Sequence, residues 1–389
     1  MNQLIRNRFV KLIDHTDFVE SGYDLLVANA ARVSMNKKSD KFTKIGETQR
    51  SDEALLSYMA DPNKNNTFDR IHFTPFCHPQ YLFLITMRTT SLVDRTFTTS
   101  LNQVSRVKLG TEIIQTKAGS ESYTIFLERG SLYHYIQLNE IHPYIMQTAP
   151  YSVKSFTRND ELRNYVSHSR ANNNNVEQIL NNNNLELIAE YHNHRFNNYT
   201  TKNDITMTNM NDYMYNGEQL QSLYNLTREQ YLDLIPATFR IAMPIVDANQ
   251  YKRHGGNSQI NEISRRYVED EPMFHETTEW RSRAKNIKQG SSDSLIEDND
   301  LVTQMINLHC LQSNYLYQQL LELNVAPELA RRHLPLNIYT TFYQTGPLSL
   351  FDRICYLRDD PHAQKEIREY AQAIKHILKN TIHNRVLEY

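Results

Sequence analysis

The sequence has little of what marks secreted, membrane-spanning or nucleic-acid-binding proteins. Its three cysteines, Cys77, Cys310 and Cys355, are widely spaced among 389 residues and predict neither a disulfide framework nor a zinc site. The formal net charge is −2, so no bulk field draws the chain to DNA or to a membrane. It contains no apolar run long enough to span a bilayer, and its first residues lack the apolar core of a signal peptide. We therefore expect a cytoplasmic chain (in the host cytoplasm if the source is viral) without nucleic-acid or membrane partners.

Several common catalytic motifs are also missing. The sequence contains no P-loop, no dinucleotide-type G-x-G-x-x-G and no G-x-S-x-G elbow. His192 and His194 form an H-x-H pair, but two histidines without a third ligand nearby do not predict a metal site. Any anion site must therefore be built locally from other residues.

Hydrophobic patterning separates two regular parts of the chain from a polar part between them. Residues 88–236 are rich in Asn and Tyr and low in periodicity, so we expect loops around some ordered elements there. In the flanking parts, the sequence predicts strands at 8–14, near 80–87 and at 238–243. It predicts helices at 24–35, 51–59, 244–254 and 301–324, a helix that begins at 327, and a last helix with Pro361 at its start. Residues 336–345 form a further structured run. We accordingly predict one catalytic domain from residues 1–87 and 237–389, with 88–236 as an insertion of unknown role.

Cations crowd around a glycine turn in the stretch NQYKRHGGNSQINEISRRYVED, residues 249–270. Gly255 and Gly256 let the backbone approach a ligand, and guanidinium groups with serine hydroxyls can form a phosphate cradle. Alternation over 264–268 predicts a strand that puts Ser264 and Arg266 on one face. The alternative is a surface hairpin whose arginines pair with the acids at 269–271.

Several motifs in the same order resemble one enzyme family, the flavin-dependent thymidylate synthases. These motifs are R253-H254 followed by S258, N261-E262, S264 and R266-Y267; L26-VANAARVS-34; H72-FTPFCH-78; A330-RRHLPLNIYT-340; and L357-RDDPHAQKEIREYAQAI-374. They lie within residues 8–87 and 238–380. The resemblance implies an α/β chain of the α+β type, with a central mixed or antiparallel sheet flanked by long helices.

The resemblance also implies a reaction and an assembly. Such enzymes transfer a methylene group from methylenetetrahydrofolate to C5 of dUMP, reduce it with FAD and regenerate the flavin with NADPH. They form homotetramers in which each active site is shared between chains. They use no covalent cysteine nucleophile on the pyrimidine, in keeping with the isolated cysteines here.

Site residues follow from the resemblance position by position. Gln250, Ser264, Arg266 and Arg331 match the positions that hold the phosphate and sugar of dUMP, and Tyr267 and Gln364 also match. Arg358 matches the arginine at the pyrimidine ring, where it favours negative charge developing at C5, so we assign catalytic roles to Arg358 and Ser264. The positions near the flavin or its phosphates are Ser34, His78, Arg253, His254, Asn261 and Glu262.

The flavin half departs from the family pattern. Gly255 stands where a second arginine is expected, and one additional residue lies between His254 and Ser264. Pro347, Ser349 and Arg353 replace Asn, Arg and Asn of a flavin-contacting stretch, and Cys77 stands where Glu is usual. Three hypotheses follow: flavin-dependent methylation of dUMP, 5-hydroxymethylation of dUMP or dCMP after loss or alteration of the reduction step, and an inactive nucleotide-binding subunit.

Overall fold

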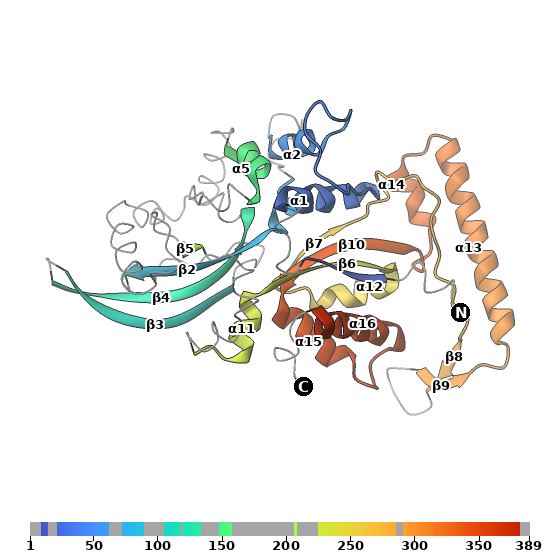
Figure 1. Ribbon diagram of the computed structural model, residues 1–389. Helices are drawn as coiled ribbons and strands as arrows, with labels where there is room; N and C mark the ends of the chain where they lie inside the picture. Colours follow the sequence, from blue (N-terminus) through green and yellow to red (C-terminus); the bar gives the residue numbers. More distant parts are fainter. Residues whose placement is uncertain are drawn as a thin grey trace.

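The centre of the fold is an antiparallel sheet with strand order β1-β6-β10-β7 (Figure 1). This computed structural model describes residues 9–14, 22–61, 72–88, 105–116, 119–133, 148–157, 206–207, 225–284 and 291–381. The four strands are β1 (Phe9–Asp14), β6 (Pro236–Pro244), β7 (Gln259–Glu262) and β10 (Tyr339–Pro347). β10 pairs with the whole of β6, from Tyr339 opposite Pro244 to Pro347 opposite Pro236. The α+β fold class is confirmed.

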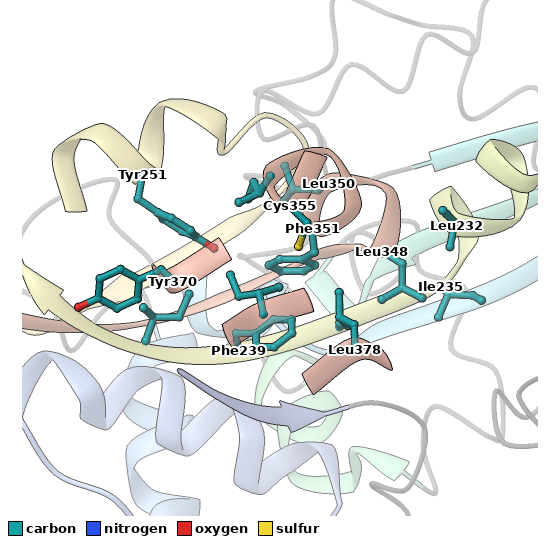
Figure 2. Close-up of a cluster of buried hydrophobic side chains, with 14 of the residues drawn as sticks. Leu232, Ile235, Phe239, Tyr251, Leu348, Leu350, Phe351, Cys355, Tyr370 and Leu378 are labelled. Carbon is teal, nitrogen blue, oxygen red and sulfur yellow. The ribbon is translucent and has the colours of Figure 1, made fainter. Parts of the chain in front are cut away.

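Three helices cover one face of this sheet: α12 (Ile245–Tyr251), α15 (Leu348–Arg358) and α16 (Lys365–Thr381). Alternate residues of β6, Phe239, Ile241 and Met243, point to that side and belong to the larger core cluster. Figure 2 shows this cluster, to which the helices contribute Tyr251, Phe351, Tyr370 and other apolar side chains. The apolar stripe predicted for the last helix is confirmed as core, because Ile367, Tyr370, Ala371, Ile374 and Leu378 are buried.

The opposite face is covered by α1 (Tyr23–Arg32), η2 (Val33–Met35) and η3 (Thr74–Cys77), with α2 (Asp52–Ala60) behind them. Ser51 caps α2 as predicted, accepting a hydrogen bond from the Ala54 amide at 3.3 Å. Asp24 of α1 caps α5 (Pro150–Thr157) in the same manner, since its carboxylate accepts from the amides of Tyr151 and Ser152 at 2.9 and 2.8 Å. Burial raises the pKa of Asp24 in spite of these bonds.

A second antiparallel sheet extends from the first, with strand order β3-β4-β2-β5 (Figure 1). Its strands are β2 (Gln80–Arg88), β3 (Ser105–Thr116), β4 (Gly119–Ser131) and β5 (Thr206–Met207). The long β3–β4 hairpin lies in the region where the sequence predicted loops around some ordered elements, and it pairs with β2 from the preceding part of the chain. The assignment of residues 88–236 to a separate insertion stays a prediction.

Helix α11 (Arg228–Leu234) joins the two sheets. Thr227 and Gln230 form a capping box at its start. Its apolar residues Leu232 and Leu234 are buried in the same core cluster as α15 and α16, and Figure 2 shows Leu232 near Leu348. The hairpin region is therefore attached to the central core through α11.

The longest helix, α13 (Asn299–Glu322), lies along one edge of the molecule (Figure 1). It follows a small hairpin of β8 (Arg281–Arg283) and β9 (Ser291–Leu295), and it is followed by α14 (Pro327–Ala330) and η6 (Arg331–His333). The predicted asparagine terminator is confirmed, because Asn324 adopts a left-handed φ of 59°. Among the described residues, no helix is long and apolar enough to cross a membrane. His192 and His194 lie outside the described residues.

The predicted start of the last helix is wrong. α16 begins at Lys365, not at Pro361. Asp360 holds the intervening residues in a turn: its carbonyl accepts from the Ala363 amide at 2.9 Å and its carboxylate accepts from the His362 amide at 2.7 Å. The aspartate side chain accepts from a backbone amide that a helical pattern would use, so the helix begins only at Lys365.

Candidate functional site

The glycine turn follows α12 directly. A short 3-10 turn, η5 (Lys252–His254), ends at Gly255, which confirms the predicted helix stop. A Cβ atom at Gly255 would lie 2.9 Å from the Lys252 carbonyl oxygen, so the turn leaves no room for a side chain there. A Cβ at Gly256 would meet no described atom within 4 Å, so the backbone at that residue is open to a ligand.

A cavity with a volume of about 930 Å³ lies beside this turn. One wall is the turn itself, with Arg253, His254, Gly256 and Asn257. A second wall is one face of α15, where lining residues recur every three or four positions from Ser349 to Tyr356. The third wall is α11. The volume is within the range of small-molecule and cofactor sites.

Hydrogen bonds join α11 to α15 at the rim of this cavity. Arg228 donates to both carboxylate oxygens of Asp352, at 3.1 and 3.2 Å. The Ser349 hydroxyl donates to the carboxylate of Asp233. Ser349 stands where the family pattern has an arginine, and here it contacts α11.

Arg358 and His254 are in direct contact. The Arg358 Nε donates to His254 Nε2 at 2.8 Å, which requires a neutral imidazole with its proton on Nδ1. Burial, together with the guanidinium groups of Arg358 and Arg353, lowers the pKa of His254 and favours that neutral form. Among the described residues, the two terminal amino groups of Arg358 have no partner, so they are free to contact a ligand.

The strand predicted over 264–268 is wrong. β7 ends at Glu262, and the Tyr267 amide donates to the Ser264 carbonyl at 2.9 Å to close a turn. The two side chains predicted to act together are nevertheless adjacent, because the amide and Nε of Arg266 lie 3.4 and 3.3 Å from Ser264 Oγ. The turn, rather than strand alternation, brings them together. Arg266 also lies over the ring of Tyr267, 5.0 Å from its centroid.

His78 is the most deeply buried of the predicted flavin residues, with 1% of its surface exposed. Its Nε2 lies 3.1 Å from Asn261 Oδ1, which can only accept, so Nε2 carries the proton. Its Nδ1 therefore accepts from the Thr345 hydroxyl at 2.7 Å, and Thr345 in turn contacts the Thr238 hydroxyl at 2.7 Å. This network holds His78 neutral, and burial lowers its pKa to about 4.

Two further residues predicted to lie near the flavin are tied to the same sheet. Glu262 accepts from the Thr340 hydroxyl at 2.7 Å and forms an ion pair with Lys252 at 2.5 Å. The Ser34 hydroxyl donates to the Ala31 carbonyl, and the Ser34 carbonyl accepts from the Ser264 amide at 2.9 Å. Ser34 therefore positions the turn that carries Ser264.

The structure brings together only part of the predicted set. Arg253 and His254 share the cavity, and Asn261 contacts His78. The predicted nucleotide residues are Gln250 in α12, Arg331 in η6 and Gln364 before α16. Among the described residues, their side chains form no hydrogen bond with Ser264 or Arg266, and Arg331 and Gln364 are exposed. The assignment of all these residues to ligands stays a prediction.

Sequence reasoning missed Arg129 of β4, which is 1% exposed and supports the glycine turn. It donates to the Asp233 carbonyl of α11 and to Ser105 Oγ, both at 3.0 Å, and to Gln80 Oε1. Ser105 Oγ also accepts from the Asn257 side chain at 3.1 Å. Arg129 therefore connects the hairpin, α11 and the turn. An isolated arginine in a polar region carries no sequence pattern that would reveal this role.

The cysteines are poor candidates for a nucleophile. All three are free and buried. Burial raises the pKa of Cys355 to about 12 and raises that of Cys77 even further, so neither forms a thiolate at neutral pH. Cys310, in the middle of α13, contacts the Asn337 side chain.

Comparisons with known proteins agree with these motifs. The family described as "Thymidylate synthase complementing protein" matches residues 152–382, more than half of the chain. Flavin-dependent thymidylate synthases are among the similar curated proteins. That of Thermus thermophilus is 37% identical over 150 residues, which are 39% of this chain and 54% of that protein. That of Aquifex aeolicus is 38% identical over 142 residues, 36% of this chain and 44% of that protein.

A eukaryotic relative and a solved structure complete the comparison. The flavin-dependent thymidylate synthase of Dictyostelium discoideum is 32% identical over 158 residues, 40% of this chain and 52% of that protein. A UMP/dUMP methylase from Streptomyces cacaoi aligns with a TM-score of 0.37 at 21% identity, over 46% of this chain and 79% of that one. The chain spans about half the length of the curated relatives it matches. Because the family model matches more than half of the chain, this chain belongs to the thymidylate synthase complementing protein family.

Proposed function

We propose that this chain catalyses folate-dependent transfer of a one-carbon unit to C5 of dUMP, followed by flavin-dependent reduction to dTMP. The contact between Arg358 and His254 carries the proposal. One residue matches the family position at the pyrimidine ring and the other matches a flavin position, so the 2.8 Å contact is where nucleotide and cofactor would meet. The names of the curated relatives support the same reaction.

The chain's own residues account for binding and charge stabilisation. Ser264 and Arg266, adjacent in one turn, would hold the nucleotide phosphate with Gln250 and with Arg331. The terminal amino groups of Arg358 would face the pyrimidine and stabilise negative charge as C5 becomes nucleophilic. His254 holds the Arg358 guanidinium in place from its Nε side. Gln364 is proposed to complete the nucleotide site.

The residues around the cavity fit a flavin dinucleotide. The volume of about 930 Å³ is adequate, Arg253 and Arg353 line the walls, and the open backbone at Gly256 can approach a phosphate. Ser34, His78, Asn261 and Glu262 would support this site from the sheet side. When bound, FAD would supply the hydride that converts the transferred methylene to methyl, with methylenetetrahydrofolate as donor and NADPH as the source of electrons.

We also propose that the protein is a homotetramer with shared active sites. One side of α13 buries Cys310, Ser313 and Tyr317 against the subunit. The opposite side exposes an apolar stripe suited to a second copy of the chain, formed by Leu301, Met305, Leu308, Tyr315, Leu316 and Leu323. A shared site would also explain why, among the described residues, Arg331 and Gln364 form no hydrogen bond with Ser264.

The product of the reaction tests the proposal. Purified protein with dUMP, methylenetetrahydrofolate, FAD and NADPH should yield dTMP by mass spectrometry, and omission of NADPH should limit the yield to the reduced flavin already present. Release of tritium from C5 of labelled dUMP reports the one-carbon transfer separately. No tritium release under any condition would instead indicate a nucleotide-binding subunit without activity.

A second function, 5-hydroxymethylation of dUMP or dCMP, is favoured by the contact between Ser349 and Asp233. This contact connects α11 to the segment 347–353, which the resemblance places in contact with flavin. Pro347, which lines the same cavity, has no N–H to offer. Water would then replace hydride as the final reactant, giving a hydroxymethyl nucleotide and tetrahydrofolate. A hydroxymethyl product formed without NADPH would establish this function, and a methyl product would exclude it.

The nucleotide half can be tested by binding alone. Arg266→Ala removes a charged hydrogen-bond donor from the proposed phosphate site, which should weaken dUMP binding by roughly 1.5 to 3 kcal/mol. Isothermal titration calorimetry measures the change, with exposed Arg283 of the β8–β9 hairpin (Arg283→Ala) as control. An unchanged affinity in Arg266→Ala would show that the phosphate binds elsewhere.

A further inference from the structure

Two arginines from distant parts of the chain line the same cavity without a carboxylate partner. Arg253 follows α12, and Arg353 lies on α15. Within the described chain, neither guanidinium has a hydrogen bond or an ion pair. Arg228 on the third wall differs, because Asp352 holds it at 3.1 and 3.2 Å. Two cations that face one cavity repel each other, and a bound anion removes that repulsion.

The glycine turn explains why the second cation comes from α15. A Cβ at Gly255 would collide with the Lys252 carbonyl oxygen at 2.9 Å, so the position after His254 cannot carry a long side chain in this conformation. The neighbouring Gly256 is open, which gives a bound anion access to the backbone. The same turn thus excludes a local cation and makes room for a ligand.

The cavity is also polarised. The α11 wall carries the carboxylates of Glu229 and Asp233, and Asp233 accepts a hydrogen bond from Ser349. An anionic group would be repelled from that wall and directed to the other two, the turn with Arg253 and α15 with Arg353. The Asp352 carboxylate on α15 is already paired with Arg228. The charge of Arg353 already acts on the turn, since it contributes with burial and Arg358 to the lowered pKa of His254.

We propose that Arg353 and Arg253 together bind the diphosphate of the flavin dinucleotide, with Arg353 supplying from α15 the cation that Gly255 cannot carry. Each guanidinium offers a planar set of donors that matches the oxygens of a phosphate. His254 remains neutral and holds Arg358, so it does not share this task. The identity of the ligand as FAD rests on the proposed function; recognition of a diphosphate rests on the two arginines and the open turn.

Binding titrations on the full chain test the proposal. FAD is titrated by the change in its fluorescence, and inorganic pyrophosphate by its competition with FAD and by calorimetry. The variants are Arg353→Gln, Arg253→Gln and Arg353→Lys. Arg283→Gln is the matched control, because this exposed arginine lies in the β8–β9 hairpin, which is separate from α11 and from the glycine turn (Figure 1). The affinity for dUMP is measured in parallel.

Arg353→Gln and Arg253→Gln should each weaken FAD and pyrophosphate binding roughly tenfold to a hundredfold, as expected for loss of a charged hydrogen bond. Arg353→Lys should weaken it less, while Arg283→Gln should not change it and dUMP affinity should stay within about twofold. FAD and pyrophosphate binding unaffected by Arg353→Gln would overturn the proposal, as would failure of the unaltered protein to bind either ligand. If pyrophosphate binds and its binding depends on Arg353, but FAD does not bind, the diphosphate site of Arg353 and Arg253 would be supported. The flavin part of the proposed function would then be refuted.

Discussion

The buried histidine His78 predicts a specific dependence of stability on pH. Its ring is neutral in the folded protein, with Nε2–H donated to Asn261 and Nδ1 accepting from Thr345. Burial lowers its pKa from 6.5 to about 4. In the unfolded chain the ring takes up a proton near pH 6.5, whereas the folded protein takes it up only near pH 4. The unfolded state therefore gains relative stability as the pH falls between these values.

The size of the effect follows from the two pKa values. Their difference corresponds to roughly 3 kcal/mol of unfolding free energy, lost progressively between pH 6.5 and about 4 and fully regained above pH 6.5. Other titrating groups contribute to the total curve, so the informative quantity is the difference between the unaltered protein and His78→Gln. That variant should be less stable at pH 7.5, by roughly 1 to 3 kcal/mol, because the hydrogen-bond network is broken.

Urea unfolding at a series of pH values and at one protein concentration measures the difference. From pH 7 to pH 4 the unaltered protein should lose about 3 kcal/mol of unfolding free energy relative to His78→Gln, so the gap should close or change sign. The reason is that only the unaltered chain gains a proton at this position on unfolding. His376→Gln, at an exposed position of α16, is the control for removing an imidazole. A gap that stays constant over this range would refute the neutral, buried state of His78.

Three further predictions concern other parts of the structure. Arg129→Met should lower the unfolding free energy by roughly 3 kcal/mol in urea titrations, because buried acceptors lose their donor; a loss below about 1 kcal/mol would contradict the connecting role. Asp52 accepts from Arg32, Thr43 and Ser39, and although burial opposes it, these bonds hold its pKa below the usual range. The stabilisation by the Asp52 carboxylate is therefore present above about pH 4 and is lost as the pH falls further. In Asp52→Asn, the unfolding free energy should decrease less steeply with falling pH in this range. Leu308→Glu on the exposed stripe of α13 should reduce the mass measured by light scattering, and an unchanged assembly would exclude this face as an interface.

The helices could be predicted because their patterns are local. The stripe of α16 and the stop of α13 at Asn324 are visible in the sequence, since apolar spacing and a left-handed asparagine do not depend on distant residues. The start of α16 was misplaced because the Asp360 side chain holds a turn that propensity alone does not reveal. The β3–β4 hairpin was missed because its apolar alternation is short, at 107–109 in β3 and at 123–127 in β4, and lies in a stretch dominated by polar residues.

The site was predictable as a set of residues but not as an arrangement. The motifs pointed to Arg358 and His254 separately, and only the fold brings their nitrogens to 2.8 Å. The adjacency of Ser264 and Arg266 was predicted on the wrong grounds, from a strand where a turn exists. Arg353 was identified as a departure from a motif, and its relation to Arg253 required the cavity to be seen.

The hydrogen bonds of Arg129 set a limit on how the chain can be recombined. A chimera that takes its β3–β4 hairpin from a relative would also exchange the partners of Gln80 on β2, of the Asp233 carbonyl on α11 and, through Ser105, of Asn257 in the glycine turn. Each of these groups lies outside the exchanged hairpin. A graft of the hairpin alone would therefore alter the turn at the cavity even though no residue of that turn had been changed. The unit that preserves all of these hydrogen bonds is the hairpin together with β2, α11 and the turn.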